Sequence, residues 1–174
     1  LPEIAAGTLR LQSMAVTEPT TGTDTTKLKT AAVKKGDRYA VSGQKVWISR
    51  IQHSDLMILL ARTTPVPEVK RKSDGMSIFI VDLRQAIGKG LTVRPIPNMV
   101  THDTNEVFFD NLEIPTENLI GEAGQGFKYI LDGLNAERGV IADGARFNGG
   151  VDMGRRTIAT KMAQYKAGQP AARA

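Results

Sequence analysis

Hydroxyl-bearing and apolar residues gather in two short segments that could hold a ligand. Residues 14–24 read MAVTEPTTGTD, which places four threonines close together around Gly22. Residues 45–49 read KVWIS and contain the only tryptophan, Trp47, followed by the hydroxyl of Ser49. An indole can pack on a flat ring, hydroxyls can bond its heteroatoms, and a small-residue turn offers N–H groups to a phosphate or amide. The two segments together suit a flat cofactor with polar edges.

Each of these features also has an ordinary explanation, and the residues alone leave both open. A threonine-rich turn can be a generic loop, and a lone tryptophan is usually part of the core. Farther along, Glu137-Arg138 can be an exposed ion pair, or Arg138 can face a phosphate while Glu137 faces a cleft as a proton acceptor. Asn135 is expected on the same helix face as Arg138. Residues 121–126 have glycines spaced GxxGxG, unlike the dinucleotide fingerprint, which favours a turn at a domain boundary.

Strands are the elements expected to position these segments. Residues 11 to about 114 combine short apolar or alternating runs with frequent turn residues, including turns at 35–37 and 42–44. This pattern predicts a mainly β fold, an antiparallel β-barrel or sandwich. The individual strands are predicted at residues 27–33, 38–41, 45–48, 56–62, 76–81, 91–94 and 105–109.

The character of the sequence changes after Pro115. Apolar residues at i, i+3, i+4 and i+7 from Phe127 predict an amphipathic α-helix, and residues 151–166 predict a second one. The predicted domains are accordingly residues 1–120, residues 121–167 and a tail at 168–174.

Composition narrows the class of protein. The chain has 174 residues, 41% hydrophobic and 24% charged, with no cysteine and a net charge of +5. Disulfides and thiolate chemistry are excluded, which fits an intracellular protein. The two histidines lie far apart, so no metal site is expected, and no apolar run reaches the roughly 18 residues of a membrane span. The positive charge fits a solvated basic surface or a polyanionic ligand such as a nucleotide or coenzyme A; nucleic acid is not expected, because the basic residues are dispersed. The chain does not start with Met and is expected to be a piece of a longer protein.

Four segments, taken in order, resemble the acyl-CoA dehydrogenase family. Residues 14–24 resemble its TEPGAGSD segment, and residues 45–49 resemble its KMWIT segment. Residues 108–115 are similar to its FEDVxVP strand, and residues 118–127 to its NLLGEEGKGF entry to a helical domain. The resemblance extends from about residue 11 to residue 146.

This resemblance implies a flavin-binding middle β-barrel at residues 1–120 and the start of a truncated C-terminal helical bundle. It implies FAD as cofactor, an acyl-CoA thioester as substrate, electron-transferring flavoprotein as oxidant, and α,β-dehydrogenation with hydride transfer to the flavin. Thr23 and the pair Asn135 and Arg138 are implied substrate contacts. Glu137 is the candidate catalytic base, and the alternative is a glutamate in the missing C-terminal part, where most family members have it. The implied cofactor-binding residues are Met14, Ala15, Val16, Thr17, Thr23, Trp47, Ile48 and Ser49.

The sequence also departs from the family pattern. Ser49 replaces a threonine, and Thr20 and Thr21 replace Gly-Ala, which makes the turn bulkier. The N-terminal helical domain and most of the C-terminal bundle are missing. Acyl-CoA oxidases and flavin monooxygenases of the same fold remain alternatives, as does a non-enzymatic β-sandwich binding module. A homo-oligomer is expected for the full-length protein, in the bacterial cytoplasm or the mitochondrial matrix.

Overall fold

The computed structural model describes residues 2–99, 103–135 and 139. The chain divides into two units, Leu1–Tyr129 and Ile130–Ala174, and each is considered by itself. In the first unit the strands are β1 (Leu11–Ala15), β2 (Ala31–Lys35), β3 (Arg38–Ser49), β4 (Leu56–Arg62), β5 (Met76–Asp82), β6 (Leu91–Ile96), β7 (Thr104–Pro115) and β8 (Leu119–Ile120), with short helices α1 (Pro2–Ala5) and α2 (Leu83–Ala86) and four 3₁₀ turns at Thr25–Lys27, Ile51–His53, Val66–Glu68 and Thr116–Asn118.

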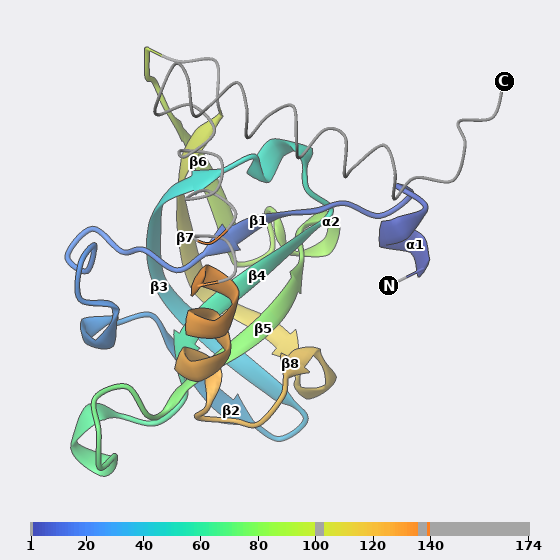
Figure 1. Ribbon diagram of the computed structural model, residues 1–174. Helices are drawn as coiled ribbons and strands as arrows, with labels where there is room; N and C mark the ends of the chain where they lie inside the picture. Colours follow the sequence, from blue (N-terminus) through green and yellow to red (C-terminus); the bar gives the residue numbers. More distant parts are fainter. Residues whose placement is uncertain (1, 100–102, 136–138, 140–174) are drawn as a thin grey trace, which may run out of the picture. The chain divides into compact units, whose positions relative to one another are not determined.

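The eight strands form one strongly curved sheet, seen in Figure 1. Their order is β6-β7-β3-β2-β4-β5-β8, and β1 pairs with β4. This confirms the mainly β class. Most pairings are antiparallel as predicted, but β1 runs parallel to β4, and Ala31 of β2 meets Arg62 of β4 in a parallel bridge. Within the described residues the end strands β6 and β8 do not pair, so the sheet is not closed into a barrel by hydrogen bonds.

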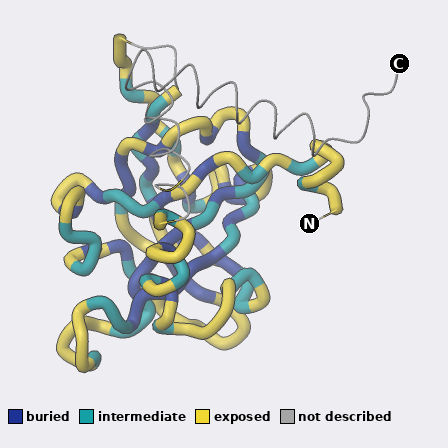
Figure 2. Tube along the Cα trace, viewed as in Figure 1, coloured by how far each residue is buried: buried dark blue, intermediate teal, exposed yellow. Residues whose placement is uncertain are grey.

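The core lies inside the curve of this sheet. The strand β4 has β1 on one side and β5 on the other, and it is buried along most of its length. Its apolar sequence, LMILLAR, fits this central position. Tyr39 of β3 and Phe79 of β5 meet edge to face with ring centroids 4.8 Å apart. In Figure 2 the buried stretches follow the strands, whereas the loops are mostly exposed.

The turn predicted at 42–44 is wrong. Residues 38–49 form the single strand β3, which bends where its register against β7 shifts between Val41 and Gly43. Gly43 has φ 150°, and a Cβ at this position would lie 2.6 Å from the Cα of Thr30. Glycine here lets two backbones approach closely within a bent strand, which in sequence looks like a turn.

Other boundaries also differ from the prediction. The strand expected at 27–33 starts only at Ala31, because Thr25–Lys27 forms a 3₁₀ turn capped by the side chain of Asp24. The strand expected at 105–109 continues to Pro115 as β7. The helix predicted from Phe127 is present and starts at residue 126. The second helix and the tail lie outside the described residues, and the domain boundaries stay predictions.

Candidate functional site

A bulge in β3 turns Trp47 outward. Lys45 pairs with Val107 and Ile48 with Asn105, so Val46 and Trp47 together face one residue of β7. Trp47 has φ 63°, in the left-handed region that a bulky side chain rarely adopts. Bulges of this kind re-aim a side chain. The indole is consequently 62% exposed, which excludes the interpretation of Trp47 as a core residue.

Hydrogen bonds of two side-chain amides, Asn105 and Gln52, support the bulge. The fully buried Asn105 donates from Nδ2 to the Ile48 carbonyl at 3.1 Å. The amide of Asn105 also bonds the side chain of Gln52, which lies in the 3₁₀ turn just after β3. A left-handed residue persists only where its surroundings over-determine it, and these bonds supply part of that constraint.

The loop after β1 lies beside the bulge. The Thr17 carbonyl accepts from the backbone N–H of Val46 at 3.0 Å. At the C-terminal end of β3, Ser13 Oγ donates to the Ser49 carbonyl at 3.2 Å. The two segments singled out in the sequence therefore lie side by side, with Met14, 39% exposed, on the outer side of β1.

The predicted cofactor residues differ in what they can offer. Ala15 and Ile48 are core residues, so only their backbone groups can serve a ligand outside the barrel. Val16 and Thr17 are half-buried, whereas Thr23 and Ser49 are exposed. An exposed indole, an exposed methionine on β1 and hydroxyls in reach of solvent match a ring that is apolar on its faces and polar at its edges.

Sequence reasoning missed an ion pair, Glu18–Lys45, in which one partner comes from each segment. Lys45 Nζ lies 3.0 Å from Glu18 Oε1, and the side chains are 0% and 4% exposed. Burial lowers the pKa of Lys45 from 10.5 to about 8, against the opposing effect of the Glu18 carboxylate. Burial alone would raise the pKa of Glu18, but Lys45 and hydrogen bonds from Thr30 and Lys29 outweigh it and hold that pKa below its ordinary value. The sequence did offer one signal for this pair: the two segments carry residues of opposite charge, Glu18 and Lys45, close to apolar residues.

The expected substrate contacts and the candidate base belong to the second unit or lie outside the described residues. Asn135 is an exposed helical residue of the unit Ile130–Ala174. Glu137 and Arg138 lie outside the residues that the structure describes. The roles of all three stay predictions from the sequence.

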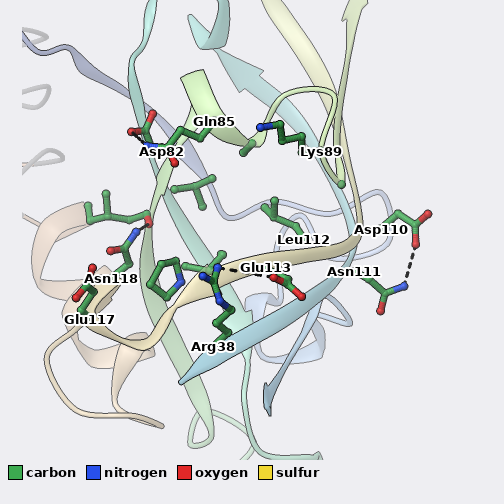
Figure 3. A pocket seen from close by; sticks show the side chains of 16 residues that line it. Arg38, Asp82, Gln85, Lys89, Asp110, Asn111, Leu112, Glu113, Glu117 and Asn118 are labelled. Atoms are coloured by element: carbon green, nitrogen blue, oxygen red, sulfur yellow. Dashed lines mark hydrogen bonds and ion pairs between the residues drawn. The ribbon is translucent and has the colours of Figure 1, made fainter. Parts of the chain in front are cut away.

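A separate hollow of about 630 Å³ occupies the open side of the sheet, shown in Figure 3. Its walls come from β5, α2, the turn before β6, and the second half of β7. Arg38 and Glu113 form an ion pair of 3.7 Å beside it, and Asn111 donates to Asp110 at 3.1 Å. None of the predicted site residues lines this hollow, so it is distinct from the face around Trp47.

Neither a metal-ligand cluster nor a membrane-spanning helix occurs in the described part of the chain. No group of three or more His, Cys, Asp or Glu side chains there could hold a metal ion. No helix there is both long and apolar enough to cross a membrane.

Comparisons with known proteins agree in pointing to one family. The family model "Acyl-CoA dehydrogenase, middle domain" matches residues 13–112. Acyl-CoA dehydrogenase FadE26 of Mycobacterium tuberculosis is 38% identical over 138 residues, which cover 79% of this chain and 34% of that protein. The chain thus spans about a third of the length of the curated relatives it matches.

Solved structures give the same result. The acyl-CoA dehydrogenase of Geobacillus kaustophilus matches with a TM-score of 0.75 and 33% identity, covering 98% of this chain and 42% of that one. A structure described as "Electron transferring flavoprotein of Acidaminococcus fermentans" matches with a TM-score of 0.67 and 32% identity, covering 83% of this chain and 35% of that one.

Proposed function

Because this chain belongs to the acyl-CoA dehydrogenase family, we propose that it is the flavin-binding middle part of an FAD-dependent acyl-CoA dehydrogenase. Members of this family are generally FAD-dependent. The observation that carries the proposal is the outward-turned Trp47, bound through its neighbour Val46 to the carbonyl of Thr17. A strained, exposed indole beside a hydroxyl-rich loop has little value for folding and fits a ligand-packing role.

In this proposal the residues of the first unit hold and orient the isoalloxazine ring. The indole of Trp47 packs on the ring, and the hydroxyls of Thr17 and Ser49 bond its polar edge. Met14 adds an apolar contact, and Ala15, Val16 and Ile48 contribute backbone groups. Thr23 contacts both the cofactor and the acyl-CoA. The role of the protein is then orientation and electrostatics.

The proposed reaction is α,β-dehydrogenation of an acyl-CoA thioester. Glu137 takes a proton from the α-carbon, and the β-carbon gives up a hydride, so that a Cα=Cβ double bond forms. FAD supplies the redox chemistry by accepting that hydride. Asn135 and Arg138 bind the CoA part, and the net charge of +5 attracts its phosphates.

The whole protein is proposed to work with further partners. Its oxidant would be electron-transferring flavoprotein, which the family resemblance implies and the match to the Acidaminococcus fermentans structure supports. A homo-oligomer of the full-length chain in the bacterial cytoplasm or the mitochondrial matrix completes the proposal; the rat relative, whose name reads "Long-chain specific acyl-CoA dehydrogenase, mitochondrial", supports the second location.

Titration of the chain with FAD tests the binding part of this proposal. Binding is followed by calorimetry and by the change in flavin absorbance, in the wild type and in Trp47→Ala. Loss of stacking on an aromatic ring is worth about 1–3 kcal/mol, so the dissociation constant should rise by a factor of about 5 to 150. Val33→Ala is the control, because Val33 is a similarly exposed hydrophobic residue on β2. No FAD binding at millimolar concentration, or equal binding by Trp47→Ala and wild type, would contradict the proposal.

The chemical part requires the full-length protein. An acyl-CoA should bleach the flavin under anaerobic conditions, and Glu137→Gln should abolish bleaching while leaving FAD bound. Hydrogen peroxide formed stoichiometrically in air would instead identify an oxidase of the same fold.

A further inference from the structure

The buried pair Glu18–Lys45 connects the two segments of the face around Trp47. Glu18 lies one residue after Thr17, in the loop that follows β1. Lys45 lies in β3, two residues before Trp47. The pair is therefore a direct side-chain link between the loop that carries a hydroxyl and the strand that carries the indole.

Further hydrogen bonds bind both charged groups. Glu18 Oε2 accepts from the backbone N–H of Lys29 at 2.7 Å, and Oε1 also accepts from that of Thr30 at 2.9 Å. Lys45 Nζ donates to the carbonyl of Val16 at 2.9 Å. The carboxylate thus binds three donors, and the ammonium group fixes the backbone of the loop as well as its side chain.

The loop is held to β3 at two successive carbonyls. Lys45 binds the carbonyl of Val16, and the backbone N–H of Val46 binds that of Thr17. Both donors directly precede Trp47. Any shift of this part of β3 would move the loop with it, so the separation between the Thr17 hydroxyl and the indole is set by these contacts.

Stability alone does not account for charges at this place. Removing two charges from water is costly, and an apolar pair of similar volume often stabilises a core equally well or better. What charged groups with several directed hydrogen bonds add is a single defined geometry. The pair lies where the proposed function requires such a geometry, beside a bulge that is itself strained.

We propose that Glu18 and Lys45 are positioning residues that fix the loop of Thr17 against the bulge of Trp47 and so pre-form the flavin-binding face. This inference rests on the proposed function, because it assigns the pair a role toward the flavin. Neither residue has to touch the ring.

The single tryptophan makes the test specific, because all indole fluorescence comes from Trp47. Time-resolved anisotropy of the free chain measures how freely the indole turns, and quenching of its emission by FAD measures binding. The variants are Glu18→Gln, Lys45→Met and the neutral pair that combines them. Glu113→Gln is the matched control, since it makes the same change in the exposed ion pair with Arg38, at the opposite end of β3.

Each single variant, studied below its unfolding midpoint, should show a faster-turning indole and an FAD dissociation constant raised at least tenfold, while Glu113→Gln matches the wild type. The double variant with the neutral pair should recover much of the wild-type stability that the single variants lose, but it should not recover the wild-type FAD affinity. Wild-type anisotropy with an affinity within twofold in both single variants would overturn the inference. Recovery of full FAD affinity in the neutral pair would also overturn it, because the charges would then serve stability alone.

Two further measurements separate the possible failures. If a single variant does not fold, Glu18→Asp keeps the charge but shortens the side chain by one methylene, and it should weaken FAD binding at least threefold; unchanged binding would contradict the inference. If the wild type does not bind FAD, the proposed function fails for this chain. The anisotropy of the free chain then still decides whether the pair holds the indole.

Discussion

The left-handed backbone at Trp47 predicts an inverted order of stability between two substitutions. Trp47→Ala and Trp47→Gly both remove the indole and its contacts. They differ in the cost of φ 63°, which alanine bears and glycine does not. At an ordinary strand position the order is the reverse, because glycine loses more conformational freedom on folding than alanine does.

The magnitude follows from comparing this position with a second one. Val33 in β2 is 56% exposed and is not among the residues with positive φ, so Val33→Gly should be less stable than Val33→Ala by about 0.5–1 kcal/mol. The unfolded-state entropy of glycine is common to both positions and cancels when the two differences are subtracted. The remainder is the cost of the left-handed conformation, about 1–2 kcal/mol. Trp47→Gly should therefore be as stable as Trp47→Ala or more stable, by up to about 1.5 kcal/mol.

Urea unfolding followed by circular dichroism measures all four variants without needing the indole signal. The difference in urea midpoint between the glycine and the alanine variant should have opposite signs at the two positions, or be absent at position 47 and present at position 33. The slopes of the transitions should be equal. If glycine is less stable than alanine by the same amount at both positions, the backbone at Trp47 is not left-handed, and the bulge would not be the cause of its exposure.

Two other stability predictions concern Gly43 and Lys45. Gly43→Ala should lower the free energy of unfolding by more than about 2 kcal/mol, because its Cβ would overlap Thr30, whereas Gly36→Ala, with φ 62° and open space around it, should lose only about 1 kcal/mol; urea midpoints compare the two, and equal losses would contradict the clash. For Lys45 the native pKa of about 8 lies below 10.5, so the unfolded chain binds this proton more tightly between these values. The stability of the wild type relative to Lys45→Met should then rise above pH 8 by up to about 1.4 kcal/mol per pH unit, and a flat or falling difference between pH 7.5 and 9.5 would refute it.

Much of the fold could be predicted because short-range patterns determine it. The run at residues 56–62 is apolar enough to require a buried strand, and β4 occupies those residues. Turn chemistry was also sufficient at 35–37, where the hairpin of β2 and β3 turns through Gly36 and Asp37. Such features depend only on residues that are close together in the sequence, so one sequence is enough to predict them.

Features that depend on distant contacts could not be predicted in this way. Gly43 resembles a turn residue until Thr30 is seen against its backbone, and β3 continues through this position. The outward direction of the indole depends on the register between β3 and β7, which no local pattern reveals. The partnership of Glu18 with Lys45 likewise needs the two segments to be brought together first.

The open side of the sheet has a consequence for solubility. β5 pairs with β8 only at Ile78 and Phe79, so residues 80–82 of that edge and the second half of β7 face the hollow of Figure 3 rather than another strand. Unsatisfied strand edges are templates for self-association, and charged side chains commonly prevent it. Here the rim of the hollow carries both positive and negative side chains. An incoming β-segment would have to bury these charges in order to pair with the edge. Neutralising this rim should make the chain more prone to self-association, with no change at the face around Trp47. The charges on the rim are Arg38, Asp82, Lys89, Asp110, Glu113 and Glu117.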